Sequence, residues 1–225
     1  MIDIVKVGKY YRECDSEQWI VRELNLHIKK NSFISIVGRS GSGKSTLLKM
    51  IGGLLPPDEG KVSFEGIDVY SMPSKQIAQF RSNEIGFVFQ DFLLEDDYTV
   101  HQNVEMALMI SGIPRNKRQR MIDDVLQHVG LENRKKAIVK NLSGGERQRV
   151  CIARAIVNNP KIILADEPCG NLDYHNGQQI MNLLLKLKEN GKTVLLVTHN
   201  LEDAKVADEI VTLQDGMITN HEIIR

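Results

Sequence analysis

The sequence predicts an α/β fold in which a core built on a parallel sheet is interrupted by a helical insertion. Two continuous apolar runs, Lys161–Ala165 and Thr193–Thr198, are typical of strands that are buried on both faces of a parallel sheet. Between about Thr99 and Asn159 the pattern changes, because apolar residues recur at helical spacing among many charges. Strand patterns return after this stretch, so we expect the core to resume there.

Short β-branched or alternating runs fill the chain up to residue 90, separated by turn-forming residues, most clearly at 56–60. They predict strands at Ile2–Val7, Trp19–Ile28, Phe33–Val37, Lys61–Phe64 and Ile85–Phe89. Later in the core, Ile210–Leu213 and Ile218 flank an Asp-Gly pair at 215–216, which predicts a closing hairpin. In the insertion, helical spacing is clearest at Val104–Leu108 and Ile122–Val129.

The composition is that of an ordinary globular chain, and it excludes several function classes. The 225 residues carry 29 Lys+Arg and 29 Asp+Glu, so the net charge is zero, which argues against an electrostatic nucleic-acid binder. No apolar stretch approaches the ~18 residues of a membrane span, and no signal peptide is expected. Cys14, Cys151 and Cys169 are widely spaced and form no metal-ligand pair, which favours a reducing cytosol.

A glycine-rich loop between a predicted strand and a predicted helix is the strongest signal for chemistry. It matches the GxxxxGK[ST] pattern, and its residues are Gly38, Arg39, Ser40, Gly41, Ser42, Gly43, Lys44, Ser45 and Thr46. Backbone N–H groups and the positive end of the helix bind phosphate oxygens in such a loop. We expect Lys44 to reach the terminal phosphates and the Ser45 hydroxyl to complete a Mg²⁺ shell. A plain glycine-rich turn is the alternative, but the complete match favours a nucleotide site.

Two acidic residues and a histidine follow the two buried strands of the core. Asp166 and Glu167 come after the first strand, and His199 comes after the second. Because ligands gather at the carboxyl ends of parallel strands, we expect these side chains beside the phosphate loop. Asp166 would hold Mg²⁺, Glu167 would be the general base for the attacking water, and His199 would orient that base. The alternatives are an exposed acidic pair and a structural histidine.

A pair of glycines opens the predicted helix that follows residue 142. Ser143, with Glu146 three residues later, is by itself a capping box at a helix N-terminus. A capping box does not require two successive glycines, whereas Gly144 and Gly145 would let an anion approach the exposed N–H groups. The sequence therefore predicts a second phosphate-binding element in addition to the loop at 38–46.

These motifs together resemble the nucleotide-binding subunits of ABC transporters, and the resemblance covers essentially the whole chain. Ser143–Glu146 matches the family's signature motif, and Gly170–Asp173 matches its D-loop. Gln90 matches the glutamine that contacts Mg²⁺ and communicates with the membrane subunit, while His199 matches the switch histidine that senses the γ-phosphate.

The resemblance also implies the cofactors, which are ATP and Mg²⁺. Tyr11 falls where the family stacks an aromatic ring on adenine, and its neighbour Tyr10 is the alternative in the next register. The implied metal-binding residues are Ser45, Gln90 and Asp166, and the implied catalytic residues are Lys44, Glu167 and His199. The implied nucleotide-binding residues include, besides the loop at 38–46, Tyr11, Gln90, Ser143, Gly144, Gly145 and Asp173.

The fold implied by the resemblance is a P-loop NTPase core at residues 1–90 and 160–225, with an N-terminal antiparallel β-subdomain. Residues 91–159 would form the inserted helical signature subdomain. The runs at 85–90 and 170–173 resemble in particular the macrolide-export and lipoprotein-release branch. Cys169 departs from that branch, which commonly has Thr there; a reactive thiol is the lesser alternative. Glu146 replaces the commoner Gln of the signature.

The resemblance implies two copies stacked head-to-tail, with each ATP between one P-loop and the other copy's signature motif. We expect an ATPase subunit, cytoplasmic and peripheral on the inner face of the plasma membrane, that drives a permease on a separate chain. The cargo would be a peptide, a lipophilic drug or a lipoprotein. The alternative is a signalling or cell-division ATPase that transmits force without transport. ABC proteins acting on DNA or ribosomes usually have long insertions or tandem cassettes, which this chain lacks.

The segment after Gln90 combines apolar and acidic residues, and it predicts a contact surface for the permease. In this hypothesis, Phe92, Leu93 and Leu94 supply the apolar contact, and the acids at 95–97 select a basic permease segment. The alternative is a solvated loop whose leucines turn into the helical core.

Overall fold

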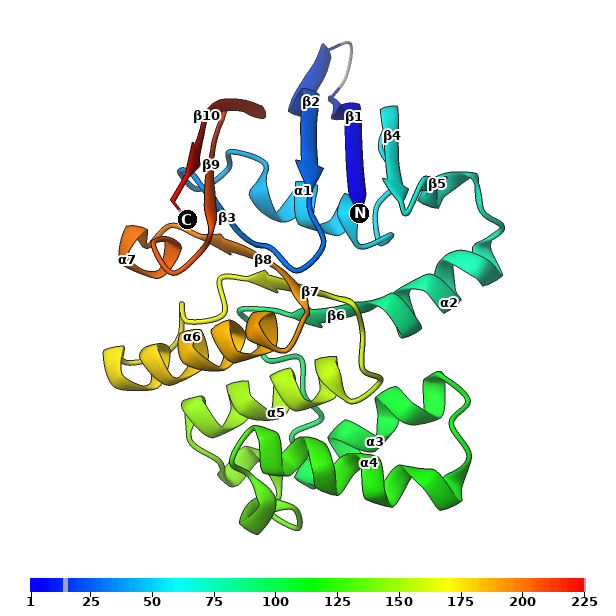
Figure 1. Ribbon diagram of the computed structural model, residues 1–225, viewed down its shortest axis with the longest axis vertical. Helices are drawn as coiled ribbons and strands as arrows, with labels where there is room; N and C mark the ends of the chain where they lie inside the picture. Colours follow the sequence, from blue (N-terminus) through cyan, green and yellow to red (C-terminus); the bar gives the residue numbers. More distant parts are fainter. Residues whose placement is uncertain (14–15, 225) are drawn as a thin grey trace.

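The computed structural model describes residues 1–13 and 16–224, so Cys14 lies outside the described residues. Figure 1 shows the architecture as layers: an antiparallel sheet at the top, α1 beneath it, a second sheet in the middle, and α3, α4, α5 and α6 below, with α2 at the side. The α/β class predicted from the sequence is confirmed, as is the N-terminal antiparallel sheet.

The central sheet has six strands in the order β10-β9-β3-β8-β7-β6, and all neighbouring pairs except β10–β9 are parallel. Its strands are β3 (Phe33–Val37), β6 (Ile85–Val88), β7 (Ile162–Asp166), β8 (Thr193–Thr198), β9 (Glu209–Gln214) and β10 (Met217–Ile223). Strand β8 is buried along its whole length and β7 at every residue before Asp166, as their continuous apolar sequences predict. Asp215, at the predicted Asp-Gly turn, joins β9 to β10 with a positive φ of 48°.

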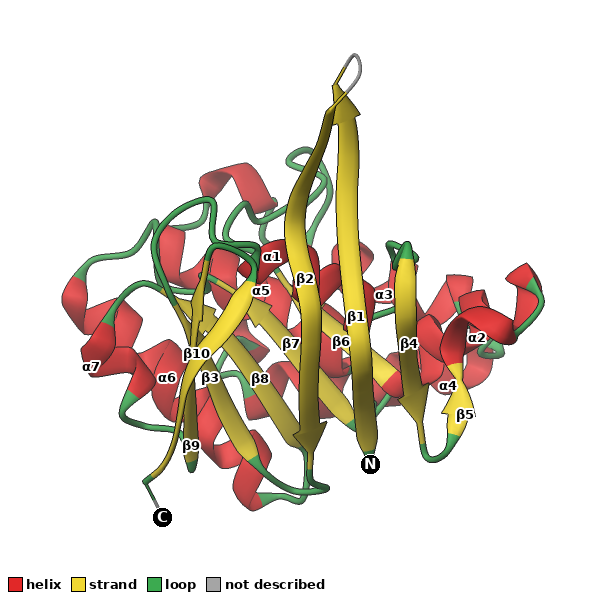
Figure 2. Ribbon diagram, turned by 90° about the horizontal axis from the view of Figure 1, so that it is seen from above, coloured by secondary structure: helices red, strands yellow, loops and turns green. Residues whose placement is uncertain are grey.

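The second sheet is antiparallel, in the order β2-β1-β4-β5. Its strands are β1 (Ile2–Glu13), β2 (Ser16–Ile28), β4 (Glu59–Phe64) and β5 (Ile67–Asp68). Figure 2 shows that β1 and β2 run side by side and extend well beyond the other strands. Lys9 anchors this ribbon, because its Nζ donates to Asp58 Oδ1 at 2.9 Å and to the carbonyl of Pro56 at 3.1 Å.

Seven α-helices cover the sheets in the described part of the chain. They are α1 (Lys44–Ile51), α2 (Ser74–Glu84), α3 (Val100–Ile110), α4 (Arg115–His128), α5 (Gly144–Ile156), α6 (Tyr174–Glu189) and α7 (Leu201–Ala204). Helix α2 was not predicted, because Phe80 is its one buried residue and a single apolar residue makes no periodic stripe. None of these helices is both long enough and apolar enough to cross a bilayer.

Two apolar cores lie on opposite faces of the central sheet. One core encloses α1 between the two sheets and includes Leu47 and Leu48. The other joins the sheet to the helices below it, and Val150 of α5 and Ile163 of β7 both belong to it. Because α5 packs directly on the sheet core, the boundary of a separate helical unit at 91–159 stays a prediction.

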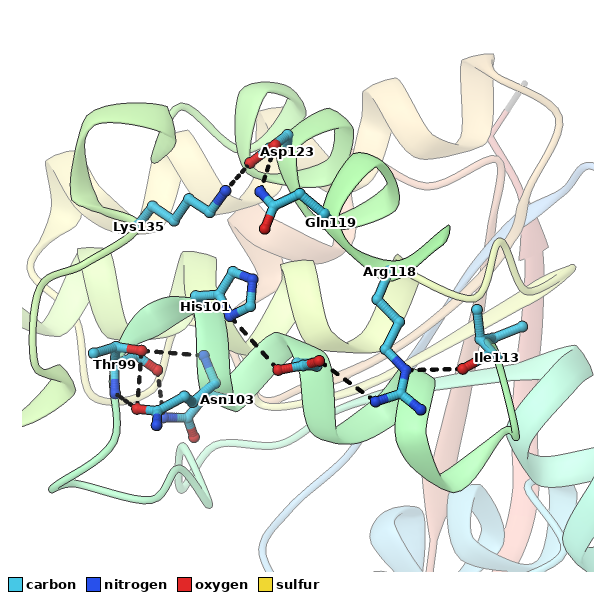
Figure 3. Close-up of polar contacts among 10 residues, drawn as sticks. Thr99, His101, Asn103, Ile113, Arg118, Gln119, Asp123 and Lys135 are labelled. Carbon is cyan, nitrogen blue, oxygen red and sulfur yellow. Dashed lines mark hydrogen bonds and ion pairs between the residues drawn. The ribbon is translucent and has the colours of Figure 1, made fainter. Parts of the chain in front are cut away.

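Buried Asn103 ties the start of α3 to the loop before it (Figure 3). Its Oδ1 accepts from the backbone N–H of Glu95 at 2.9 Å, and its Nδ2 donates to the carbonyls of Glu95 at 3.0 Å and Thr99 at 3.1 Å. Figure 3 also shows Arg118 donating from Nε to the carbonyl of Ile113, 2.8 Å away. Polar side chains therefore fix the backbone path on both sides of α3, Asn103 before it and Arg118 after it.

We predict that Asn103→Ala lowers the free energy of unfolding by about 2–4 kcal/mol, because it removes the hydrogen-bond partner of both backbone groups of residue 95 and leaves a cavity at a fully buried position. Urea denaturation measures this change. Gln102→Ala, which removes only the reciprocal half of an exposed capping box at Thr99, serves as the control and should cost about 1 kcal/mol or less. Equal losses in the two variants would contradict the anchoring role.

Candidate nucleotide-binding and catalytic site

An open cleft of about 690 Å³ lies where β3, β7 and β8 end. Figure 2 shows these strands side by side in the central sheet. The residues lining the cleft are Tyr11, Ile20, Ser40, Gly41, Ser42, Gly43, Lys44, Ser45, Thr46, Gln90, Glu167 and His199. The structure thus brings together the glycine-rich loop, the residue after β7 and the residue after β8, as their positions in the sequence predict.

The path of the loop requires glycine at two positions. A Cβ on Gly38 would lie 2.2 Å from the carbonyl oxygen of Leu213, and Gly43 has a φ of 97°. A Cβ on Gly43 would also lie 2.5 Å from the carbonyl oxygen of Ile20. Close backbone contacts to β2 and β9 therefore fix the shape of the loop.

The interior of the loop presents donors that fit a phosphate. Lys44 is 7% exposed, and its Nζ donates to the carbonyls of Gly38 at 2.8 Å and Arg39 at 2.9 Å. Gly43 precedes α1 and has no side chain to cap the first N–H groups of the helix, which no carbonyl within the helix can satisfy. The buried Ser42 Oγ has no hydrogen-bond partner among the described residues. Unpaired buried donors are costly, so the loop is organised for an anion.

The two acids after β7 have different surroundings. Asp166 Oδ1 accepts from Ser45 Oγ at 2.9 Å, and burial raises the pKa of Asp166. Glu167 Oε2 lies 2.9 Å from His199 Nδ1, and the Glu167 side chain is 16% exposed whereas that of His199 is 69% exposed. Glu167 also has a positive φ of 48°, an unfavourable conformation held in place by its N–H bond to the carbonyl of Val197. These contacts aim a carboxylate and an imidazole at the cleft.

The oxygen donors near Ser45 fit Mg²⁺. The hydroxyl of Ser45, the carboxylate of Asp166 and the amide oxygen of Gln90 are hard oxygen ligands, which Mg²⁺ prefers. The ion usually fills its remaining coordination positions with water and phosphate oxygens. No group of three or more His, Cys, Asp and Glu residues that could bind a metal occurs in residues 1–13 and 16–224. The donor set is therefore one for an ion that arrives with a phosphate, not for a metal held by protein ligands alone.

Two further predicted residues line the cleft from other elements. Tyr11 is 51% exposed on β1 and faces the cleft, whereas Tyr10 packs on Trp19 with ring centroids 5.0 Å apart. The structure thereby favours Tyr11 over Tyr10 for a stacking role. Gln90 lies against Gly170, where a Cβ would come within 2.9 Å of the amide nitrogen. Ile20, also at the cleft, was not predicted, since nothing in its local sequence sets it apart.

The signature residues and Asp173 do not line this cleft. Ser143 caps α5 through a complete capping box with Glu146, whose pKa is lowered by its hydrogen bond from the Ser143 N–H. Packing within the chain also favours glycine at position 145, because a Cβ there would lie 2.2 Å from Asn176 Oδ1 on α6. Asp173 caps α6 and faces a separate cavity. Within one chain, the two predicted phosphate-binding elements are thus separate.

A smaller cavity of about 180 Å³ adjoins Glu167 and His199. Asp203, which was not predicted, lines it, and burial together with the charge of Glu167 raises the pKa of Asp203. Cys169 lies in the same cavity, and burial raises the pKa of its thiol to about 12. A thiol with that pKa carries little thiolate at neutral pH, which argues against the reactive-thiol alternative.

The acidic run at 95–97 is exposed, as the sequence suggested, and two of its acids also have partners within the chain. Asp96 pairs with Arg147 at 2.5 Å, and Asp97 pairs with Lys140 at 2.6 Å. Leu94 packs against the helical core, as the alternative interpretation held, and Leu93 is exposed. Because exposed ion pairs of this kind are weak, selection of a basic permease segment by these acids stays a prediction.

Comparisons with known proteins agree with this geometry. The ABC transporter family profile matches residues 21–170. The chain is 42% identical to an ABC transporter ATP-binding protein, YtrE, of Bacillus subtilis, over 94% of this chain and 91% of that one. It is also 42% identical to the macrolide export ATP-binding/permease protein MacB of Vibrio parahaemolyticus, over 91% of this chain but only 31% of MacB.

Solved structures give the same result. The dimeric ATP-binding cassette MJ0796, in a post-hydrolysis state bound to ADP and Pi, superposes with a TM-score of 0.92 at 39% identity, covering 100% of this chain and 99% of that one. With a matching profile, relatives of similar length and a solved cassette of the same fold, the chain belongs to the ABC transporter family as one of its ATP-binding cassettes.

Proposed function

We propose that the protein hydrolyses ATP and that this reaction drives a membrane permease carried on a separate chain. The main observation behind the proposal is that the glycine-rich loop at 38–46, the P-loop, lines the same cleft as Glu167 and His199. Relatives that this chain covers almost end to end are named ATP-binding proteins, whereas MacB is named as an ATP-binding/permease protein. These names support a divided system in which the permease is a second polypeptide.

In the proposed mechanism, the P-loop binds the phosphates of ATP. Lys44 exchanges its hydrogen bonds to two loop carbonyls for the terminal phosphates, while the N-terminal N–H groups of α1 and the Ser42 hydroxyl bind further oxygens. Ser45, Asp166 and Gln90 would hold Mg²⁺, which neutralises charge that develops on the phosphate oxygens. Tyr11 would stack on adenine at the mouth of the cleft.

Glu167 is the proposed general base. Its hydrogen-bonding contact with His199 fixes the carboxylate, and its partial burial keeps competing water away. The base accepts a proton from water as the water oxygen attacks the terminal phosphorus, and the bond from that phosphorus to the ADP oxygen breaks. His199 orients the base, and its more exposed ring would sense the terminal phosphate.

We further propose that the complete site forms between two copies stacked head-to-tail. Ser143, Gly144 and Gly145 lie away from the cleft of their own chain, so a second copy would supply them, together with Asp173. The dimeric structures of MJ0796 support this assembly. The neutral net charge gives no reason to expect nucleic acid as a partner.

The names of the relatives support a proposal for the transported class and the location. MacB is named for macrolide export, so we propose that the permease exports or extracts a lipophilic drug, a peptide or a lipoprotein. The cassette would then be a peripheral protein on the cytoplasmic face of the membrane, bound there through its permease.

We predict that Glu167→Gln preserves ATP binding and slows hydrolysis by about 10²–10⁴-fold, the usual contribution of general base catalysis. Phosphate release measures the rate, and equilibrium dialysis with ATP measures binding. Lys44→Ala is the contrasting variant and should weaken ATP binding itself. A Glu167→Gln protein that hydrolyses ATP at the wild-type rate would eliminate Glu167 as the base.

We predict that Tyr11→Ala raises the dissociation constant of ATP about ten- to hundredfold, because stacking on a base is worth about 1–3 kcal/mol. GTP should bind nearly as well as ATP, since stacking uses the ring face alone. Tyr10→Ala is the matched control, because Tyr10 packs on Trp19, and its ATP affinity should hardly change. The assignment fails if the two variants bind ATP equally well.

A further inference from the structure

We propose that residues 109–120, the α3–α4 corner, bind the surface of an anionic lipid bilayer. In this arrangement, Met109 and Ile110 enter the apolar edge of the bilayer, and basic side chains from the first turns of α4 contact lipid phosphates. The inference rests on the proposed function, which locates the cassette at a membrane. It adds a direct lipid contact to the contact made through the permease.

The α3–α4 corner carries a local excess of positive charge, although the chain as a whole is neutral. Residues 109–120 include four basic residues and no acidic residue. Arg115 and Lys117 are exposed, and within residues 1–13 and 16–224 neither of them forms a salt bridge. The side chain of Arg120 is 90% exposed and lies 3.9 Å from Asp124, and an exposed pair at that distance is weak. Three cations are therefore available to a partner.

The fourth basic residue, Arg118, is occupied within the fold. Its Nε donates to the carbonyl of Ile113 at 2.8 Å (Figure 3), and its Nη1 lies 3.4 Å from Glu105 Oε1. Glu105 is also 3.7 Å from His101 Nδ1, so the acid of α3 already has partners. Arg118 therefore holds the turn against α4, and it is not part of the proposed lipid contact.

Met109 and Ile110 are exposed because of the way in which α3 ends. Ile110 is 82% exposed and Met109 is 54% exposed. Gly112, with a φ of 72°, donates from its N–H to the carbonyl of Met109 at 3.0 Å. The next N–H, that of Ile113, donates to the carbonyl of buried Leu108 at 2.9 Å, and Ile113 packs against the helical core. The turn thus holds two adjacent apolar side chains in water, and covering them is favourable.

The basic and the apolar side chains converge on the same edge of the molecule. Cα–Cβ bonds in an α-helix tilt toward the N-terminus, so the side chains of α4 lean back toward the turn that follows Ile110. Lys117 and Arg120 are three residues apart and share one face of α4. Figure 1 shows the turn between α3 and α4 at the right-hand edge, where it projects beyond α5. A projecting corner suits a broad surface.

Exposed apolar residues beside basic residues are typical of segments that bind the interface of an anionic bilayer. Lys and Arg have long apolar stems, so their charged ends reach lipid phosphates while neighbouring apolar side chains enter the acyl boundary. An acidic protein segment would satisfy the charges alone, whereas an anionic bilayer offers negative charge and an apolar layer side by side. Cations are unfavourable in the first turn of a helix, so the stability of α4 does not explain them.

The test of the charges measures flotation of the full chain with vesicles of phosphatidylcholine, alone or mixed in equal parts with phosphatidylglycerol. Lipid titrations give the partition coefficients of the wild type and of the double variant Arg115→Gln/Lys117→Gln. Lys29→Gln/Lys30→Gln is the matched control, because both lysines are exposed between β2 and β3. The two double variants have the same net charge, so a difference between them depends on position alone.

We expect the wild type to bind the mixed vesicles and to bind phosphatidylcholine much less. Raising NaCl from about 0.1 M to about 1 M should release it, because the Debye length falls from about 10 Å to about 3 Å. A cation near the surface contributes about fivefold, so Arg115→Gln/Lys117→Gln should lower the partition coefficient about 30-fold. The control variant should lower it by about twofold or less, since its lysines lie away from the α3–α4 corner.

The apolar contact is tested with Ile110→Ser, which should lower the partition coefficient about fivefold or more. Its control is Ile223→Ser, because Ile223 is 70% exposed on β10 and should have no lipid contact. Equal effects of the two serine variants would overturn the proposed insertion.

Failure to bind the mixed vesicles, equal binding to both kinds of vesicle, or equal losses in the two double variants would also overturn the inference. Binding to soluble polyglutamate without binding to vesicles would overturn it in favour of an acidic protein segment. None of the substituted residues lines the nucleotide cleft, so phosphate release by the same preparations without lipid tests the proposed function separately.

Discussion

The parallel register of β3, β8 and β7 is the constraint on which the site depends. Val37 of β3 pairs with Thr198 of β8, and Asp166 of β7 pairs with Val197, so the three strands end at the same level. The residue after β3 is Gly38, the first of the P-loop; Glu167 follows β7, and His199 follows β8. Parallel strands must be buried on both faces, and this requirement explains the two cores. The N-terminal sheet with α1 covers one face, and the long helices cover the other.

Residues whose role is set by local sequence were predictable. The P-loop, the acids after β7 and His199 after β8 are motifs that require only a strand before them and, for the P-loop, a helix after it. The family resemblance favoured Tyr11, but the local sequence alone does not separate it from Tyr10, because that depends on which ring meets Trp19 across the β1–β2 pair. Adjacent strand residues point to opposite faces, and the sequence of one strand does not show which face each residue takes until the partner strand is paired with it.

Tertiary contacts also decided what sequence patterns left open. The acids at 95–97 are exposed, but Asp96 and Asp97 also form ion pairs with Arg147 on α5 and Lys140 before it, which the local sequence does not show. Gly145 looked like a requirement for an anion, yet the packing of Asn176 from α6 already demands glycine there. Helix α2 escaped prediction because a single buried residue gives no helical periodicity. In each case, the missing information was a contact between distant segments.

Helix α5 links the two halves of the proposed split site. It begins at the signature residues, and farther along Gln148 Nε2 donates to the carbonyl of Phe89 at 3.3 Å, directly before Gln90. Arg147 pairs with Asp96, and Arg154 holds the carbonyls of residues 92 and 93. A movement of Gln90 at one nucleotide would therefore be passed along α5 toward the signature that faces the other nucleotide.

The central claim, that two copies complete each site, is tested most directly by mixing two inactive variants. Lys44→Ala disables the P-loop, and Ser143→Asp disables the signature by repelling phosphate while keeping a good N-cap for α5. A mixed dimer contains one site built from an intact P-loop and an intact signature, so an equal mixture should recover up to about a quarter of the wild-type ATPase rate. If each variant is inactive alone and the mixture recovers nothing, the two elements do not meet across a head-to-tail dimer.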